Sequence, residues 1–540
     1  MSSTDDAAHV ARAPLRAYAD DDASDARFVD AASGKRLSGC AFVRLVRAAR
    51  RALVASAATV EAVKGRRGDF DADASFAVVV AIGCDVGVEF VAYFLAACAL
   101  GWTPAPLNSR WSASEARDAC ASVSATMVVL DASHVARWKD ASASAVFEGL
   151  TVLDASAVWE EETPGEEDEG LGGLKRRDDG ACSFCFTSGT TGKPKAVMLT
   201  HEGVCAASRA KHEVVGYERG DTYLHCAPLF HVGGLSSAHA SLAVGSKHVF
   251  MPKFDVKDAL RLIDEECVTA FIAVPTMMAM MTREVKENPD AAVSGTSVKR
   301  ILVGAGRLMD GQLEAIRSVF PNAVVTLAYG MSETSSSVTF LRPDDPRLEG
   351  DPMFAGNAVR GVEIKTNADG ELLVRGPIVM LGYHGVDRQD TFDAEGWFAT
   401  GDLGKVAESE SPESETGARV WLYGRVKDII KTGGENVVPH EVESVLNSHP
   451  DVETSAVAAV PDPTWGETVV AFVQRKASAR GGETCEAKSI VDHCVDANLA
   501  RFKVPKRIVF VDSIPLNAMG KVSKSALLET YARELETPSL

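Results

Sequence analysis

The chain has 540 residues, of which 56 are basic and 75 acidic, so its formal net charge is −19 at pH 7. Hydrophobic residues make up 46% and charged residues 24%, a balance that excludes a mainly disordered chain, a fibre and a disulfide-rich miniprotein. The acidic excess argues against nucleic acid or an anionic membrane as the main partner, because either would need a basic face.

The predicted elements of the N-terminal part alternate between strands and helices, which indicates an α/β layer architecture. The apolar run 76–102 is interrupted by charged residues and glycines, so it predicts a strand and a helix rather than a membrane span. In chain order we expect a strand at Phe76–Ile82, a helix from about Val86 to near Gly101, a helix at Ser112–Ser122, and strands at Thr126–Asp131 and Val152–Asp154.

Two acidic insertions, Glu160–Glu169 and Glu408–Glu415, are expected to be solvated loops, the second at the tip of a long hairpin. The pattern changes after about Arg425 to that of a compact α+β unit. Its expected elements are helices at Val437–Asn447 and Ile490–Leu499, and strands at Ser455–Val460, Val469–Gln474 and Arg507–Val511. The expected fold is a large multi-layer α/β N-terminal domain (1–426) and a small α+β C-terminal domain (427–540), joined by a short polar stretch around Lys427 and Asp428.

Cysteine usage and the chain ends bear on the compartment. The eleven cysteines are scattered through apolar segments, which favours a reducing compartment. Cys182 and Cys185 form a C-x-x-C pair, but no second ligand pair completes a zinc site. The first residues lack the apolar core of a secretory signal, and the final Pro-Ser-Leu is a distant match to a peroxisomal address. An intracellular, soluble protein is expected, with peroxisome, plastid and cytoplasm left open.

A loop rich in hydroxyl groups and glycine lies between two strand-like runs, Ala181–Phe186 and Ala196–Leu199. Its hydroxyls can donate to phosphate oxygens, its glycines allow close approach of backbone N–H groups, and its lysine adds positive charge. It is not a Walker A loop, because Pro194 stands where Ser or Thr should follow the lysine. The phosphate-binding candidates are Thr187, Ser188, Gly189, Thr190, Thr191, Gly192 and Lys193.

This loop resembles the phosphate-binding signature of the adenylate-forming ligases, which include acyl-CoA synthetases, luciferases and peptide-synthetase adenylation domains. Four further segments resemble motifs of that family, in the family's order, so that the resemblance covers the chain from about Phe76. They are Ala328–Thr334, with Ser332 in place of the usual threonine, Gly396–Asp402, Tyr423–Asp428 and Pro515–Lys521.

The resemblance implies an enzyme that uses ATP, Mg²⁺ and CoA to convert a small-molecule carboxylic acid into an acyl-adenylate and then a thioester. It implies three catalytic residues: Glu333, which also binds the metal, His231 beside the carboxylate site, and Lys521, which neutralises charge as pyrophosphate leaves. Besides the phosphate loop, the implied ATP-binding residues are Gly304, Ala305, Gly306, Tyr329, Gly330, Ser332, Asp402 and Arg425. Lys427 occupies the hinge position, and Gly433 and Gly434 match the loop along the CoA arm.

The acid is suggested by a narrower resemblance. Segments Tyr223–Phe254, Tyr329–Ser336 and Lys431–Glu443 are similar to plant-type 2-succinylbenzoate–CoA ligases of phylloquinone biosynthesis. Such a pocket should hold a donor for a second carboxylate, for which Ser236, Ser237 and His239 are candidates by proximity in sequence.

Several alternatives stay open. A malonyl-, fatty- or 4-coumarate-type acyl-CoA synthetase is the runner-up, followed by a peptide-synthetase adenylation domain. A noncatalytic nucleotide-binding protein is the alternative from another class. A Rossmann oxidoreductase is disfavoured, because no G-x-G-x-x-G follows a strand. The oligomeric state is open.

Overall fold

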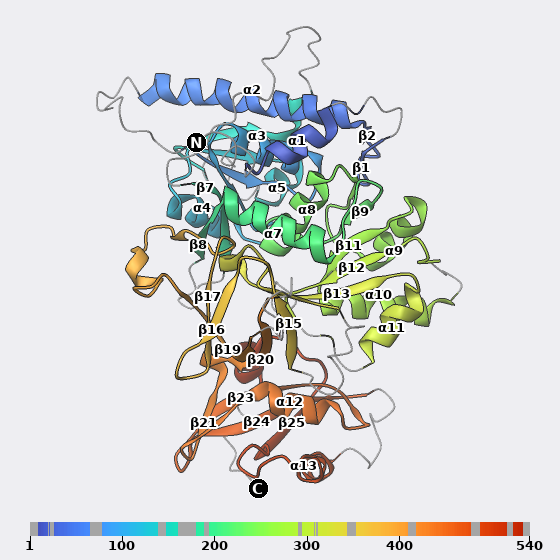
Figure 1. Cartoon of the computed structure of the whole chain (residues 1–540), viewed down its shortest axis with the longest axis vertical. Helices are drawn as coiled ribbons and strands as arrows, with labels where there is room; N and C mark the ends of the chain where they lie inside the picture. The colour runs from blue at the N-terminus through green and yellow to red at the C-terminus, as the bar shows by residue number, and fades with distance from the viewer. Residues whose placement is uncertain are drawn as a thin grey trace.

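The computed structural model arranges the chain around four β-sheets, with the N-terminal helices at one end of the molecule and the C-terminal sheet at the other (Figure 1). The structure describes residues 9–19, 21, 26–64, 78–138, 147–159, 180–187, 194–289, 294–306, 308, 311–342, 353–408, 417–476, 486–515 and 522–532, with the side chains of 58–64 left aside. Within this part of the chain, no helix is both long enough and apolar enough to cross a membrane.

The four-stranded sheet is parallel and has the order β4-β3-β5-β6. Its strands are β3 (Val79–Gly83), β4 (Thr103–Pro106), β5 (Met127–Leu130) and β6 (Thr151–Asp154). The helices of this region are α1 (Arg12–Ala19), α2 (Gly39–Lys64), α3 (Val88–Ala99), α4 (Ala113–Ser122) and α5 (Ala132–Arg137), with the 3₁₀ helix η3 (Ala155–Trp159). Helix α4 begins where the sequence predicts, because Ser112 and Glu115 form a capping box.

The largest sheet has thirteen strands in the described residues, in the order β16-β17-β19-β20-β15-β14-β13-β12-β11-β9-β10-β1-β2. Six neighbouring strands, from β13 to β1 in that order, run parallel. The strands are β1 (Phe28–Asp30), β2 (Arg36–Leu37), β9 (Thr222–His225), β10 (Lys247–Phe250), β11 (Ala270–Ala273), β12 (Arg300–Val303), β13 (Val324–Tyr329), β14 (Thr339–Leu341), β15 (Phe354–Ala358), β16 (Glu363–Thr366), β17 (Glu371–Arg375), β19 (Phe398–Ala407) and β20 (Arg419–Arg425).

Helices connect the parallel strands, and a short third sheet lies beside them. The helices are α7 (His201–Val214), α8 (Val232–Ala243), α9 (Val256–Glu265), α10 (Pro275–Glu287) and α11 (Gln312–Val319), with 3₁₀ helices η5 (Ser332–Thr334), η7 (Arg388–Asp390) and η8 (Val426–Asp428). The third sheet has the order β18-β8-β7, with β7 (Ala181–Thr187), β8 (Lys195–Thr200) and β18 (Gly382–Tyr383).

The C-terminal elements form a separate five-stranded sheet with its own apolar core, in which Val457, Ala471 and Phe472 are fully buried. The strands are β21 (Ile430–Thr432), β22 (Glu435–Val437), β23 (Val452–Asp462), β24 (Gly466–Arg475) and β25 (Arg507–Val511), and the helices are α12 (Pro439–Asn447), α13 (Ala487–Asp496) and α14 (Lys524–Thr530). The expected fold class, a large α/β part followed by a smaller α+β part, is confirmed.

Most expected elements form within a few residues of their predicted bounds, and the differences lie at their ends. Strand β3 begins at Val79 in the described residues, whereas 76–77 lie outside them. Helix α13 ends at Asp496 rather than Leu499, since Asn498 adopts a left-handed backbone (φ 58°). The expected hairpin around the second acidic insertion forms between β19 and β20. Most of that insertion, and the whole of the first, lie outside the described residues.

Candidate active site

The expected phosphate loop joins two antiparallel neighbours, β7 and β8, whose register pairs Thr187 with Lys195. The prediction of a loop between two strands is therefore confirmed at both ends. Residues 188–193, which carry the remaining phosphate-binding candidates, lie outside the described residues. Strand β7 is buried along its length up to Phe186, so it holds the start of the loop firmly in the core.

Ser332 and Glu333 form a second part of the site, next to the end of β7. The Cys185 thiol of β7 lies 3.7 Å from the Ser332 hydroxyl. The Glu333 Oε1 atom accepts a hydrogen bond of 2.7 Å from the Tyr383 hydroxyl on β18, and the Lys195 ammonium lies 5.0 Å from the Tyr383 ring centroid. The loop ends, the hydroxyl of Ser332 and the carboxylate of Glu333 thus converge.

Tyr383 was not among the residues predicted from the sequence. Burial, together with the adjacent Glu333 carboxylate, raises the pKa of its phenol, so the hydroxyl stays protonated and donates. This bond occupies one oxygen of Glu333, and no hydrogen bond to its other oxygen, Oε2, forms among the described residues. No motif marks Tyr383, because its contact with Glu333 spans fifty residues of chain.

Tyr329, Asp402 and Arg425 form the third part of the site. The Tyr329 hydroxyl donates to Asp402 Oδ2 over 2.9 Å, and Arg425 Nε pairs with Oδ1 over 3.0 Å. Asp402 and Arg425 are direct neighbours across β19 and β20, and Asp402 is only 6% exposed. Burial, followed by the charge of Asp402, raises the pKa of Tyr329. Three predicted residues from distant segments therefore meet at one carboxylate.

The Gly304–Gly306 turn and His231 lie at the same edge of the large sheet as Tyr329. Parallel strands end at a common edge. Gly304 directly follows β12, His231 follows β9, and Tyr329 is the last residue of β13. Ala305 adopts a left-handed backbone with φ 63°, and a Cβ built on Gly304 would meet nothing within 4 Å. The backbone at Gly304 therefore borders open space, whereas a Cβ on Gly306 would lie 3.2 Å from the Pro275 ring. His231 directly precedes α8, and its ring lies 4.4 Å from that of Phe230.

The predicted hinge and CoA-loop residues lie in and after η8, which directly follows Arg425. Lys427 is exposed in η8, between the last strand of the large sheet and the first of the C-terminal sheet. Gly433 and Gly434 form the two-residue turn between β21 and β22, both with positive φ (59° and 85°). A Cβ on Gly433 would lie 2.7 Å from the Trp465 ring. Lys521 lies outside the described residues.

The candidates for a second-carboxylate donor differ in their contacts. His239 Nε2 lies 2.8 Å from the Val10 carbonyl oxygen, so this ring is engaged with the N-terminal segment. Ser236 accepts a hydrogen bond of 2.8 Å from Lys211 Nζ, and Ser237 is fully buried beside it. Lys211 was not among the residues predicted from the sequence. The run of small residues at 203–208, which precedes it, does indicate that this face of α7 is buried.

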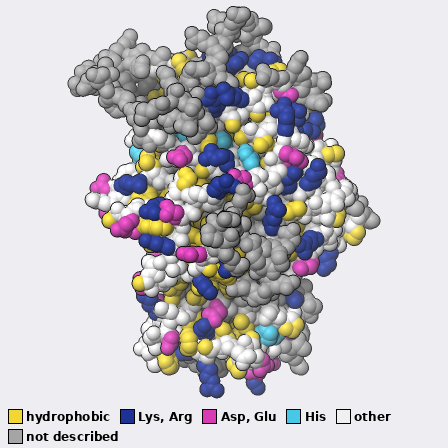
Figure 2. All heavy atoms as spheres, viewed as in Figure 1, with side chains coloured by type: hydrophobic (Ala, Val, Ile, Leu, Met, Phe, Trp, Pro, Cys, Tyr) yellow, Lys and Arg dark blue, Asp and Glu magenta, His cyan; other side chains and the backbone are white. Residues whose placement is uncertain are grey.

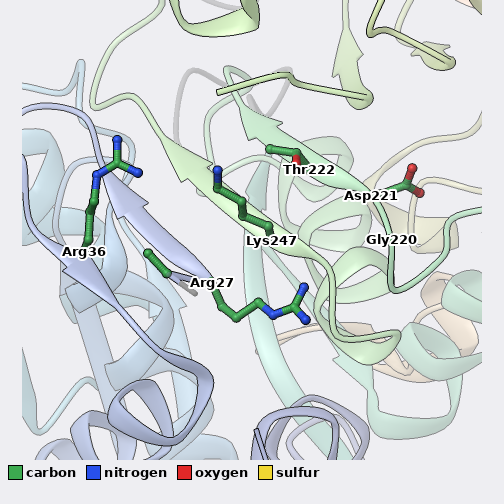
Figure 3. A pocket seen from close by; sticks show the side chains of 7 residues that line it. Arg27, Arg36, Gly220, Asp221, Thr222 and Lys247 are labelled. Carbon is green, nitrogen blue, oxygen red and sulfur yellow. The ribbon is translucent and has the colours of Figure 1, made fainter. Parts of the chain in front are cut away.

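A basic pocket of about 270 Å³ lies elsewhere, near the amino ends of β9 and β10 (Figure 3). Its cations are already paired. Glu266 binds both Arg36 and, over 2.8 Å, Lys247. Arg27 pairs with Asp21 over 3.0 Å. The pocket therefore offers little uncompensated charge, and it lies at the sheet edge opposite to His231 and Tyr329.

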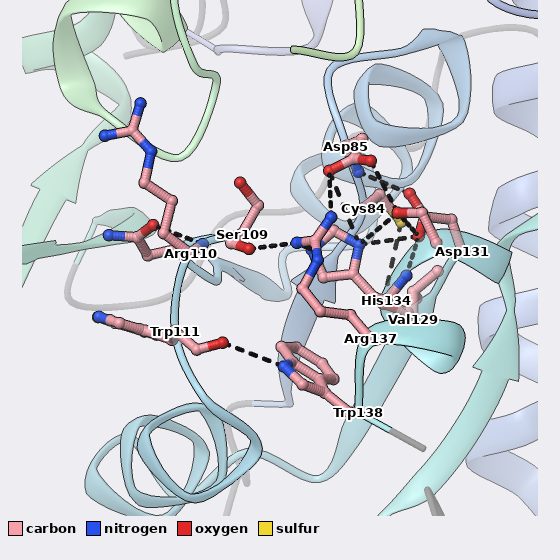
Figure 4. Close-up of polar contacts among 12 residues, drawn as sticks. Cys84, Asp85, Ser109, Arg110, Trp111, Val129, Asp131, His134, Arg137 and Trp138 are labelled. Atoms are coloured by element: carbon pink, nitrogen blue, oxygen red, sulfur yellow. Dashed lines mark hydrogen bonds and ion pairs between the residues drawn. The ribbon is translucent and has the colours of Figure 1, made fainter. Parts of the chain in front are cut away.

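A cluster at the ends of β3 and β5 holds Asp85, Asp131 and His134 (Figure 4). Asp131 Oδ1 lies 2.8 Å from His134 Nδ1, and Asp131 Oδ2 accepts the Asp85 amide over 2.6 Å. Burial opposes ionisation of Asp131, but these contacts outweigh it and lower the pKa to about 2. Arg137 lies 3.5 Å from Asp85. The carboxylate oxygens of Asp131 are already used in these bonds, and a guanidinium lies nearby. The cluster is therefore a structural cap rather than a metal centre.

On the face of the molecule seen in Figure 2, basic and acidic side chains are intermixed.

Comparisons with known proteins identify the family of the chain. Residues 72–384 match the AMP-binding enzyme model, and residues 441–521 match the C-terminal domain of AMP-binding enzymes. The chain therefore belongs to the AMP-binding enzyme family. The expected resemblance is confirmed, as is the enzyme class, an acid–thiol ligase, for which ATP and CoA are the expected cosubstrates.

Individual relatives are similar over most of the chain. The 2-succinylbenzoate–CoA ligase, chloroplastic/peroxisomal, of Arabidopsis thaliana is 34% identical over 83% of this chain and 86% of its own length. The long-chain-fatty-acid–CoA ligase FadD13 of Mycobacterium tuberculosis is 32% identical over 82% and 86%. The o-succinylbenzoate CoA synthetase MenE of Bacillus subtilis, solved with its acyl-adenylate intermediate, is 25% identical with a TM-score of 0.73, covering 95% of this chain and 97% of that one.

Proposed function

We propose that the protein is an ATP-dependent 2-succinylbenzoate–CoA ligase of phylloquinone or menaquinone biosynthesis. It joins the acid to AMP with release of pyrophosphate, and then transfers the acyl group to the CoA thiol. The observation that carries the ligase chemistry is that Ser332 and Glu333 lie against the strands β7, β8 and β18, next to the two strand ends that carry the phosphate loop. The choice of acid is supported by the Arabidopsis thaliana relative and the Bacillus subtilis neighbour.

In this proposal, different groups of the site bind different parts of the nucleotide. The loop from Thr187 to Lys193 binds the phosphates, and the Gly304–Gly306 turn accepts adenine against its backbone, with Tyr329 and Gly330 beside it. Asp402 binds the ribose. Its bonds to Tyr329 and Arg425 hold the carboxylate in place, which reduces the ordering cost when the nucleotide arrives.

Glu333 is the residue that would hold Mg²⁺. Its Oε1 is fixed by Tyr383, and a carboxylate oxygen is the ligand that a hard cation prefers. The ion would neutralise charge on the triphosphate as pyrophosphate leaves. The Tyr383 hydroxyl orients the carboxylate, and His231 orients the acid at the same sheet edge.

The two half-reactions require two positions of the C-terminal sheet. Lys521 stabilises the charge that develops at the α-phosphate, an effect that is larger in the transition state than in the ground state. Rotation about Lys427 then brings the Gly433–Gly434 turn toward the acyl-adenylate, where it borders the CoA arm. The exposed position of Lys427 between two sheets suits such a hinge.

The proposal is tested by pyrophosphate release with ATP, Mg²⁺ and CoA across four acids: 2-succinylbenzoate, malonate, 4-coumarate and octanoate. The highest kcat/KM is expected for 2-succinylbenzoate. Preference for octanoate would instead favour the fatty-acyl alternative, which the FadD13 relative supports. Turnover of none of the acids would favour a noncatalytic nucleotide-binding protein.

Lys521→Ala tests the chemistry separately from the choice of acid. Loss of an electrostatic group of this kind costs at least ~10²-fold in rate, so acyl-adenylate formation should fall by that factor. An unchanged rate would contradict the role of the lysine.

For the compartment we extend the proposal to chloroplast or peroxisome, the two locations in the name of the Arabidopsis thaliana relative.

A further inference from the structure

Lys211 on α7 is a buried cation without a counter-charge. It is 1% exposed. Its Nζ donates to the hydroxyls of Ser236 (2.8 Å), Ser337 (2.8 Å) and Ser336 (3.3 Å). No carboxylate forms an ion pair with it in the described part of the chain, and burial lowers its pKa to about 7. Buried charges are normally paired, because removal of an ion from water is costly. Three neutral hydroxyls orient the ammonium but do not compensate its charge.

The ammonium lies beside the candidate active site. Ser336 and Ser337 belong to the turn that directly follows Glu333, and a Cβ built on Gly330 would lie 2.4 Å from the Ser336 carbonyl carbon. Ser236 lies on α8, the helix that His231 precedes. The two segments that hold Nζ therefore continue from those that hold the predicted acid- and metal-binding residues.

The turn itself is conformationally unusual. Ser335 and Ser336 both adopt a left-handed backbone, with φ 49° and 68°. Residues with a Cβ rarely do so, and such strain persists where the surrounding structure requires it, often at a ligand clamp. In this chain the consequence is that the Ser336 and Ser337 hydroxyls both reach Lys211.

More polar groups surround the same helices without partners. The side-chain oxygens of four buried residues have no hydrogen bond of good geometry among the described residues: Ser208, Tyr217, Tyr223 and Ser237. Ser208 lies one turn before Lys211 on α7, and the Ser237 hydroxyl lies close enough to both phenols to lower their pKa against the larger effect of burial. Buried hydroxyls are normally satisfied. The unsatisfied hydroxyls of Ser208 and Ser237, on the two helices that hold the unpaired cation and Ser236, indicate the place of an anionic ligand.

We infer that Lys211, with Ser236 and Ser337, binds the second carboxylate of a dicarboxylic acid substrate, the one that is not activated. This inference rests on the proposed function, which supplies an aromatic acid with two carboxylates. The carboxylate compensates the ammonium and accepts the hydroxyl protons, and an ion pair of this kind is stronger than a bond from the ammonium to a neutral hydroxyl. A monocarboxylic acid has nothing to place there, so Lys211 determines specificity.

The test compares two acids that differ only in the ring carboxylate, 2-succinylbenzoate and 4-oxo-4-phenylbutanoate. Pyrophosphate release by the full-length enzyme gives kcat/KM for each. Lys211→Met keeps the length of the side chain and removes its charge, so kcat/KM should fall at least ~30-fold for the dicarboxylate and less than about threefold for the monoacid. Ser236→Ala, a milder change, should lower only the dicarboxylate value, by about tenfold. The exposed Lys257→Met should change neither.

The outcomes separate the inference from the proposed function. If the ratio of the two kcat/KM values is unchanged in both variants, while the wild type turns over 2-succinylbenzoate, the subsite is overturned and the proposed function stands. An equal loss of kcat/KM for both acids gives the same unchanged ratio and shows that the role of the lysine is structural. Wild-type enzyme that turns over neither acid overturns the proposed function and the subsite together.

Discussion

The buried charge of Lys211 should make the stability of the protein depend on pH in a defined direction. Folding lowers the pKa of this lysine from 10.5 to about 7. Between these values the unfolded chain binds more protons than the folded one, so stability rises with pH. At 1.36 kcal/mol per pKa unit, burial costs about 4 kcal/mol at pH 7 and about 1 kcal/mol at pH 9.5.

The perturbation is Lys211→Met, which removes the titrating group and keeps most of the apolar side chain. The free energy of unfolding, from urea titration followed by tryptophan fluorescence, is measured for both proteins at pH 7 and pH 9.5. The wild type should gain about 3 kcal/mol relative to the variant over this range. Other titrating groups contribute equally to both proteins, so they cancel in the comparison.

The two histidines that interact electrostatically with Lys211 do not titrate in this window. Burial lowers the pKa of His212, and that of His239 to about 4, so both rings are neutral throughout. Lys257→Met, a change at an exposed lysine, should follow the wild type at both pH values. A constant difference between wild type and Lys211→Met would refute the reasoning, because it would mean that Lys211 keeps an ordinary pKa in the folded protein.

Three further sets of substitutions test the proposed site. Glu333→Gln should lower pyrophosphate release without CoA at least ~10²-fold, whereas Tyr383→Phe, which removes only a hydrogen bond to it, should cost about tenfold or less; equal losses would contradict a metal-binding role. Lys427→Pro should retain acyl-adenylate formation and lose CoA thioester formation, and equal loss of both would count against a hinge. Gly433 has φ 59°, and Gly433→Ala would place a Cβ 2.7 Å from the Trp465 ring. This change should lower the melting temperature and thioester formation. The control is Gly370→Ala, which should lower both less, because Gly370 also has a positive φ (80°) but nothing lies within 4 Å of its Cβ position.

Local structure followed closely from the sequence. The capping box at Ser112 set the start of α4, and the apolar runs on both sides of residues 188–193 predicted the two strands β7 and β8, which pair in the structure. The order of elements also gave the expected fold class. These features depend on neighbours along the chain, through hydrophobic periodicity, turn chemistry and end capping.

The contacts between distant segments were not accessible in this way. The sequence placed Tyr329, Asp402 and Arg425 in separate motifs, but only the sheet order joins them at one carboxylate. Tyr383 has no motif at all, and its bond to Glu333 depends on the pairing of β18 with β8.

What the sequence by itself determined was the set of chemical groups and the elements that carry them, because these follow from residue type and local periodicity. What only the tertiary structure decided was the environment of each group. Lys211 reads in sequence as an ordinary helical lysine, and His239 and Ser236 read as equal candidates. The packing of α8 and the Ser335–Ser337 turn against α7 buries Lys211 beside Ser236. His239 instead contacts the Val10 carbonyl oxygen. Burial sets the cost of a charge, and burial is a property of the assembled fold.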